Sequence, residues 1–349
     1  GYREPIENAS ATIRSLIEQK LLLYRKNTDQ VSLWHGVDID LRGRLEREKG
    51  RVGLTFDVVD FVKSELPPSP WLPVEYNADF AITRYFSCEF IPASRIDEEI
   101  VEAERRLDDG ADGMILQILP DDEENVEALL ARVLSLSLPE RLVFSLPRKA
   151  LALFDAALEV HTLRRMQDDD ALIGEDPLVL PELRQMTDDA LEYLRRSLMR
   201  VSRPMIDGPI WIAQGSVQPV DSAVELRRML STICRSAFPE TPRINNELIV
   251  RKKPRQVIVN SRKKLVAAIL DHYGDEDFGL EGYRPDRSML NTVLLHTGLY
   301  KNDKGAWRFV TPQEVKDAHL RHVWKLFRDL VSKPTKTPKD LEGFFGSLK

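Results

Sequence analysis

The stretch GMILQILPDDEENVEALLARVLSLSLPERLVFSLP (113–147) decides the predicted fold. Its two ends, GMILQILP (113–120) and RLVFSLP (141–147), are nearly continuous apolar runs, which are typical of strands buried on both faces. Between them, DDEENVEALLARVLSL (121–136) has a helical apolar period and acids in its first turn, where carboxylates complement the helix dipole. A strand, a helix and a strand at this spacing predict a parallel β-α-β unit.

The alternation of strands and helices continues on both sides of this unit. We expect strands within 80–91 and 209–220, and helices at 95–110, 148–166, 181–201 and 222–238. Residues 74–239 are therefore predicted to form an α/β domain, in which a parallel-containing sheet has flanking helices.

Residues 1–73 are predicted to form a helical N-terminal segment. Apolar residues recur with a helical period in 6–25 and in 55–66. PPSPWLP (67–73) ends the second helix, because proline lacks an amide donor and constrains its neighbour. The chain begins GYREPIENAS, without an initiator methionine or a basic-then-apolar leader, so we interpret this start as that of an excised fragment or as the remnant of a tag.

The composition argues against two broad classes, globally disordered proteins and proteins with a membrane-spanning helix. Of the 349 residues, 42% are hydrophobic and 30% are charged, which is enough apolar material for a folded core. No run of about 18 apolar residues occurs, so we expect no membrane-spanning helix. Cys88 and Cys234 are distant in the sequence, which argues against a disulfide framework and predicts a reducing, cytoplasmic location.

The net charge of −6 conceals an asymmetry. Residues 240–349 carry 21 Lys and Arg against 14 Asp and Glu, a net of +7, whereas residues 1–239 carry 29 basic and 42 acidic side chains, a net of −13. Such an asymmetry indicates either a nucleic-acid-facing region beside a non-binding one or two domains with different solvated surfaces. Both interpretations stay open at this point.

Residues 240–332 are predicted to form a separate winged-helix-like α+β module, followed by a tail at 333–349. The expected order is a helix at 255–273, a helix at 283–298, a hairpin at 299–310 and a helix at 311–331. Asp286 is the expected N-cap of the second helix, and Thr311 with Glu314 forms a capping box for the last one.

Short catalytic motifs are missing from the sequence. It contains no P-loop, no dinucleotide-binding glycine motif, no His-Glu-x-x-His and no Gly-x-Ser-x-Gly. Asp121 and Asp122 are interpreted as acids that begin a helix, and the His319/His322 pair as a surface pair without further ligands. We therefore predict no catalytic residue, no metal ligand and no cofactor in this chain.

The densest local feature is RKKPRQVIVNSRKK (251–264), which contains no acid. We select as candidate binding residues the cations of this window together with those of the hairpin and its exposed aromatic residue: Arg251, Lys252, Lys253, Arg255, Arg262, Lys263, Lys264, Lys301, Lys304, Arg308 and Trp307. Such a cluster neutralises nucleic-acid phosphates without reading bases. An acidic partner surface, or a simply solvated helix, explains the same charges.

Several phrases in their order resemble a known family. They are LYRKNTDQVSLWHGVDIDLRGRLE (23–46), SCEFI (87–91), DGMILQILPDDEEN (112–125), PRINNELI (242–249), GLEGYRPDRSMLNTVLLHTGLY (279–300) and GAWRFV (305–310). Together they resemble the region beyond the P-loop in large bacterial phage-defence ATPases of the BrxC/PglY kind. The resemblance implies a cytoplasmic fragment that couples a nucleotide domain to foreign DNA or to other defence subunits.

The absence of a P-loop departs from the complete pattern of that family. No ATP-binding residue can be transferred to this chain, so ATP and Mg²⁺ are expected only in the parent protein. The Trp34-His35-Gly36 turn and Asp38 are expected at an interface with the missing nucleotide domain, or in a packed turn.

The leading hypothesis is a non-catalytic binding portion of an anti-phage defence ATPase, with DNA, defence subunits or the ATPase domain as partners and no membrane. One alternative is a standalone α/β enzyme with a site beyond its strand ends, near Asp121, Asp122 and Arg148. Another is a DNA-binding regulator whose α/β domain senses a ligand.

Overall fold

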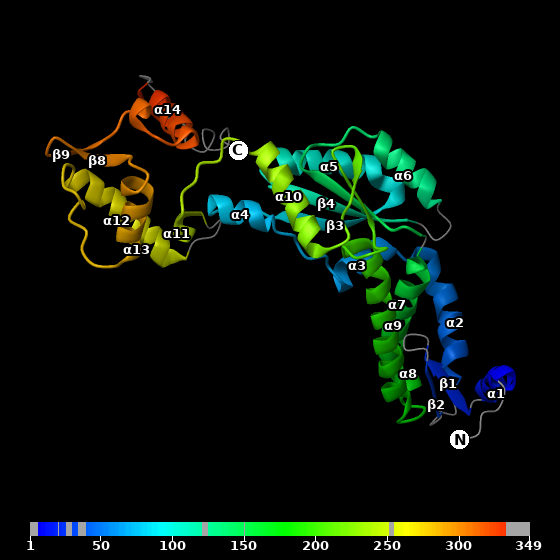
Figure 1. The fold of residues 1–349 in the computed structure, drawn as a ribbon. Coiled ribbons are helices and arrows are strands. Elements are labelled where there is room, and N and C mark those ends of the chain that lie inside the picture. The colour runs from blue at the N-terminus through cyan, green and yellow to red at the C-terminus, as the bar shows by residue number, and fades with distance from the viewer. Residues whose placement is uncertain are drawn as a thin grey trace.

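A five-stranded sheet forms the centre of the computed structural model, which describes residues 6–19, 21–25, 30–33, 40–120, 125–149, 151–250 and 255–332 (Figure 1). Its strands are β3 (Phe86–Pro92), β4 (Gly113–Leu119), β5 (Leu142–Leu146), β6 (Ile210–Ala213) and β7 (Ser216–Gln218), and they lie side by side in that order. The first three strands are parallel, which confirms the predicted β-α-β unit. The last two are antiparallel to their neighbours.

Helices cover both faces of this sheet, so the mixed α/β class is confirmed. On one face, α5 (Ile96–Asp108) and α6 (Val126–Ser135) pack on Met114, Leu116 and Ile118 of β4. The alternate β4 residues Ile115 and Leu119 face the other side. The helices there are α3 (Val58–Glu65), α4 (Val74–Phe80), α7 (Leu153–Gln167), α9 (Val179–Ser202) and α10 (Ala223–Ala237).

The helices α7 and α9 extend beyond the sheet and form the core of a second region with the N-terminal elements (Figure 1). There α2 (Leu41–Val52) and the short α8 (Asp170–Ile173) pack against them. Near the same end lie α1 (Ile6–Glu18) and the antiparallel pair β1 (Leu22–Arg25) and β2 (Gln30–Leu33). Residues 41–66 thus share apolar cores with the helices of the α/β domain.

The C-terminal module has its own apolar core, built around Phe278, Leu290, Tyr300 and Leu320. Its elements are α11 (Glu247–Val250), α12 (Gln256–Asp271), α13 (Pro285–Met289) with a π-helical continuation (Leu290–Leu295), β8 (Tyr300–Asp303), β9 (Ala306–Phe309) and α14 (Ala318–Ser332). The two strands form an antiparallel hairpin. Figure 1 places the module on the α4 side of the sheet.

Three predicted helices differ in the structure. Residues 6–25 form α1 only up to Glu18, and β1 begins at Leu22. The N-cap of α13 is Arg284 rather than Asp286, because Pro285 takes the first helical position, where a missing amide costs nothing. The predicted Thr311–Glu314 capping box is present, but it begins a 3₁₀ turn, Pro312–Glu314, and α14 starts only at Ala318.

A local hydrogen bond accounts for the late start of α14. The Asp317 carboxylate accepts a 2.7 Å hydrogen bond from the Leu320 amide, which is the contact that an N-cap residue makes.

The strand expected within 80–91 is also shorter, since Ala81 ends α4 in a left-handed conformation (φ 51°) and β3 begins at Phe86. Among the described residues, no helix combines the length and the apolar character that crossing a bilayer needs.

Candidate functional site

The structure divides the sequence-predicted cations of the C-terminal module into two groups. Arg262, Lys264, Lys301 and Arg308 have partners within the module. For Arg255, Lys263 and Lys304, which are exposed, the described part of the chain contains no ion pair or side-chain hydrogen bond. Arg251, Lys252 and Lys253 lie outside the described residues.

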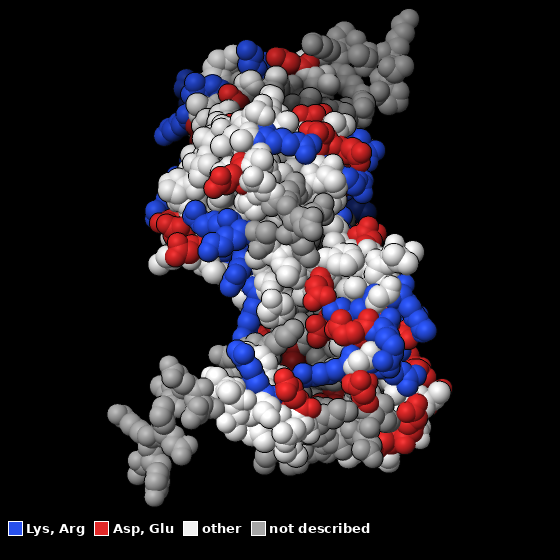
Figure 2. All heavy atoms as spheres, turned by 90° about the vertical axis from the view of Figure 1, so that its right-hand side faces the viewer, with Lys and Arg blue, Asp and Glu red and all other residues white. Residues whose placement is uncertain are grey.

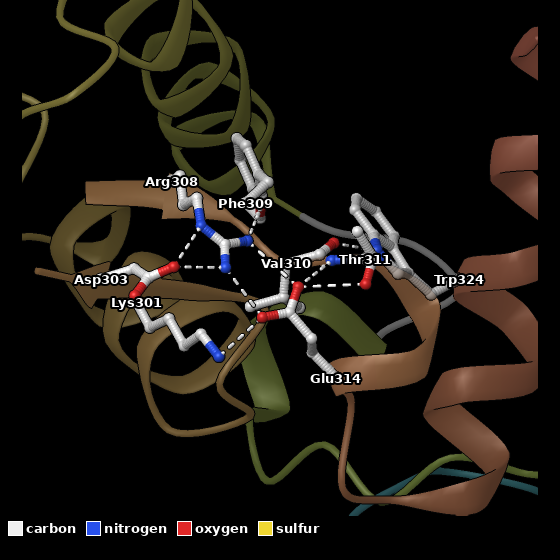
Figure 3. Close-up of polar contacts among 8 residues, drawn as sticks. All are labelled: Lys301, Asp303, Arg308, Phe309, Val310, Thr311, Glu314 and Trp324. Atoms are coloured by element: carbon white, nitrogen blue, oxygen red, sulfur yellow. Dashed lines mark hydrogen bonds and ion pairs between the residues drawn. The ribbon is translucent and has the colours of Figure 1, made fainter. Parts of the chain in front are cut away.

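Arg308 is the centre of a polar network that joins the hairpin to the segment before α14 (Figure 3). Its Nη2 donates to Asp303 Oδ2 at 2.6 Å and to Glu314 Oε1 at 2.8 Å, and its Nη1 donates to Glu314 Oε2 at 3.1 Å. The guanidinium therefore binds the Glu314 carboxylate in a bidentate manner, through two parallel hydrogen bonds, which is a strong arrangement for an arginine–carboxylate pair. This contact sets the hairpin against the Thr311–Glu314 turn.

Glu314 collects further donors from the same region. Lys301 Nζ lies 3.0 Å from its Oε1, and the Thr311 amide and hydroxyl donate to Oε2 at 2.8 and 3.0 Å. The hydrogen bonds from Arg308, then those from Thr311 and Lys301, hold the pKa of the Glu314 carboxyl well below its usual range. In return, Glu314 and Asp303 raise the pKa of Arg308. Glu314 and Arg308 therefore form a charged pair at neutral pH.

The hairpin register explains why an acid is needed here. Lys301 pairs directly with Arg308 across the two strands, and like charges in opposite positions destabilise a hairpin. Glu314 contacts both cations and removes this repulsion. Sequence reasoning predicted Glu314 only as part of the capping box. Its contact with the two cations depends on the observed register, in which Lys304 and Gly305 form the loop.

Trp307 contributes to the core of the module. Its ring stacks on Tyr300 with centroids 5.5 Å apart and an interplanar angle of 24°. The Tyr300 hydroxyl accepts a hydrogen bond from the Gly274 amide at 3.1 Å and donates to the Asp275 carbonyl at 2.9 Å. Trp307 is half-buried in the second residue pair from the hairpin turn, where its ring packs on Tyr300.

Two cations of α12 contact the neighbouring helices α11 and α13. Arg262 Nη2 donates to the carbonyl oxygens of Leu248 and Ile249 at 3.2 and 3.1 Å, near the end of α11. Lys264 Nζ lies 3.0 Å from Asp286, whose side chain is only 4% exposed. Asp286 thereby connects α12 to α13, a role that differs from the N-cap expected for it.

The hairpin turn presents Lys304 to solvent. Lys304 and Gly305 form a two-residue loop in which both residues have positive φ, 55° and 94°, as a type I′ turn requires. The Asn302 side chain accepts a 2.9 Å hydrogen bond from the Gly305 amide and closes the turn. The structure thus has a rigid hairpin with a lysine at its tip.

The remaining sequence candidates fall into three cases. Asp121, Asp122 and the segment from Trp34 to Asp38 lie outside the described residues, and Arg148 is exposed after β5. His319 lies 3.9 Å from Glu240, and no three His, Cys, Asp or Glu side chains within the described ranges are grouped so that they could hold a metal ion.

Basic and acidic groups are interspersed on the face that Figure 2 draws, in keeping with the many ion pairs of the chain. This face belongs to the right-hand side of Figure 1, whereas the C-terminal module lies at the left of that figure. Comparison of the chain with protein-family models, with curated proteins and with solved structures finds no match.

Proposed function

We propose that the C-terminal module is winged-helix-like and binds nucleic acid through its phosphates. Arg255 and Lys263 of the α12 region and Lys304 of the hairpin tip make these contacts. The hairpin β8–β9 is the wing in this proposal, and α12 and α13 are the two helices that precede it. Phosphate contacts of lysine and arginine give affinity without base specificity, so binding is insensitive to sequence.

The observation that carries the proposal is a hairpin braced by the Arg308–Glu314 network (Figure 3), with Lys304 in its two-residue turn. Asp303 and Glu314 neutralise the other two hairpin cations, Lys301 and Arg308, which leaves Lys304 as the hairpin cation without a partner among the described residues. A cation on a rigid element loses little conformational entropy when it meets a phosphate. The internal network therefore supports the role of Lys304 by fixing its position.

The test is fluorescence anisotropy of the full chain with a labelled mixed-sequence DNA duplex over a series of salt concentrations. The test variant combines Arg255→Gln, Lys263→Gln and Lys304→Asn. Asparagine is favoured at the first position of a type I′ turn, so Lys304→Asn removes the charge without disturbing the hairpin. The control variant removes three exposed cations of other regions, Arg47→Gln, Lys149→Gln and Arg184→Gln.

We expect the wild-type affinity to fall steeply with salt, and the test variant to lower the slope of log K against log salt by about 3, close to 0.9 per lost phosphate contact. The control variant keeps the wild-type slope. Salt-independent binding by the wild type, or the same loss in both variants, contradicts the proposal. A further variant with Gln at 251–253 measures the share of the predicted cluster that precedes α12.

The wider proposal is that the chain is a non-catalytic portion of a bacterial defence ATPase, and the family resemblance of the sequence supports it. The chain alone is then expected not to hydrolyse ATP, with or without DNA. Turnover that persists through stringent repurification would overturn this part of the proposal and leave the nucleic-acid part unaffected.

A further inference from the structure

A cavity of about 420 Å³ opens between α9 and α10 over the sheet face opposite α5 and α6. The connection from α3 to α4, which includes Trp71, forms one of its walls, and Phe90 and Gln117 of the parallel strands β3 and β4 form its floor. Its volume lies within the range of small-molecule sites. It is separate from the C-terminal module.

Gln117 is the most informative residue of this cavity. It is 1% exposed and is the single polar side chain of β4, whose other residues are glycine or apolar. Its Oε1 is buried and has no hydrogen-bond partner in the described part of the chain. Buried side-chain amides are normally satisfied, so an unpaired one that lines a cavity indicates a ligand that supplies the partner.

Three arginines line the same cavity, and none of the described residues that line it is an aspartate or a glutamate. They are Arg195 of α9, Arg203 at the end of α9, and Arg227 of α10. None has an ion pair within the described residues, and the Arg227 guanidinium lies 5.8 Å from the centre of the Trp71 ring. All three side chains are exposed, so the mouth of the cavity carries positive charge that an anion can approach from solvent.

A structural role explains only part of this arrangement. Arg203, the C-cap residue of α9, complements the negative end of the helix dipole, whereas Arg195 lies about two turns before that end, beyond the reach of this effect. Arg227 lies in the first half of α10, where a cation opposes the helix dipole. The convergence of both helices on one opening is what an anion site requires.

We propose that this cavity binds a small organic anion with a planar body. Its phosphate or carboxylate group contacts Arg195, Arg203 and Arg227 at the mouth, because guanidinium groups bind both anions through paired hydrogen bonds. The planar body lies against Trp71 and Phe90, and its inner edge hydrogen-bonds to the Gln117 amide. Among the described residues that line the cavity, the charged side chains are the three arginines.

The test uses 8-anilinonaphthalene-1-sulfonate, a planar organic anion that fluoresces when it enters an apolar site, with the full chain at pH 7. Neutral N-phenyl-1-naphthylamine is the matched uncharged probe. The test variant is Arg195→Gln, Arg203→Gln and Arg227→Gln. The control variant is Arg196→Gln, Arg200→Gln and Arg228→Gln, which removes three exposed arginines from the same two helices outside the cavity lining.

We expect saturable binding of the anionic probe, at least about tenfold weaker binding of the neutral one, and a loss of at least about tenfold in the test variant only. Equal binding of the two probes, or equal loss in both variants, overturns the proposal. Displacement of the probe by AMP assigns the natural anion as a phosphate and displacement by indole-3-acetate as a carboxylate. Displacement by neither one overturns the ligand class.

A second variant tests the floor of the cavity independently. Gln117→Leu removes the unpaired amide, so we expect the free chain to unfold at a higher temperature and the competing ligand to bind more weakly, while the sulfonate probe binds as before. A lower unfolding temperature would instead show that Gln117 has a structural partner and would remove it from the site. None of these outcomes depends on nucleic-acid binding.

Discussion

At the scale of single residues, Glu314 is the acid that holds the hairpin charges together. Removing its charge leaves Asp303, which contacts Arg308, as the remaining described acid of the network, and Lys301 loses its ion pair. We therefore predict that Glu314→Gln lowers the unfolding temperature of the module by a few degrees at pH 7, as followed by tryptophan fluorescence. The control is Glu281→Gln, an exposed acid of the same module, which we expect to have no effect.

The effect of Glu314→Gln should depend on pH in a defined direction. The folded pKa of Glu314 lies below its unfolded value, which is about 4.3. Its stabilisation is therefore complete above that value and is lost as the pH falls through the folded pKa. The difference between wild type and variant should be largest near neutrality and shrink below about pH 4. A difference that grows in acid would contradict the assignment.

The two thiols give a second residue-scale prediction. Cys88 and Cys234 are both buried, and burial raises the pKa of each thiol to about 12. Since the thiolate is the reactive form, only about one thiol in 10,000 is ionised at pH 8. We expect no rapid reaction of the native chain with a disulfide reagent, and reaction of two thiols after denaturation. Rapid labelling of the folded chain would show that one of these sites opens.

At the scale of elements, α10 depends on its N-terminal cap. The Ser222 hydroxyl accepts a hydrogen bond from the Glu225 amide at 3.3 Å, and the Glu225 carboxylate accepts one from the Asp221 amide at 2.9 Å. We predict that Ser222→Ala destabilises the chain by about 1 kcal/mol in urea unfolding. Ser222→Asp keeps a cap and should restore most of the loss. Ser236→Ala, at an exposed position of the same helix, serves as the matched control.

Elements with a long, single periodicity were predictable, and those decided by a few local contacts were not. The apolar runs at 113–120 and 141–147 correctly predicted two buried parallel strands. The apolar run IWIA at 210–213 predicts a buried strand but not whether that strand runs parallel or antiparallel to its neighbour. The antiparallel pairing with β5 depends on tertiary contacts that the sequence does not identify. The seven-residue α4 is too short for a helical period, and Phe80 was assigned to a strand because aromatic residues favour strands.

In the candidate site too, features of the local sequence were predictable, and contacts between distant segments were not. Local charge density identified the cations of the module, and turn composition identified the hairpin that carries Lys304. Which of those cations form ion pairs depends on acids from other segments: Asp286 pairs with Lys264, and Glu314 pairs with Lys301. The cavity at Gln117 had no sequence signal, because a single glutamine in an apolar strand becomes informative only when its surroundings are known.

At the scale of the whole molecule, the cores are separate. The core of the C-terminal module contains only residues from 244 onward, whereas the sheet has its own clusters on each face. We predict that Leu290→Ala costs about 2–5 kcal/mol and speeds hydrogen exchange within 255–332 only. Leu116→Ala, an equally buried leucine of the sheet, should speed exchange in the α/β domain instead. Uniform acceleration by either variant would show that the two cores unfold as one unit.

The strand order β3-β4-β5-β6-β7 has a consequence for how the chain is made. Because each strand pairs with the one that precedes it in the sequence, no strand has to wait for a distant partner or insert between two others. Once Leu146 has left the ribosome, both parallel pairs can already form, and every later strand adds to a single growing edge. The opposite edge meets Trp71, which is synthesised before β3. Vectorial synthesis and sheet assembly can therefore proceed in the same direction, which shortens the time that a nascent apolar edge is exposed.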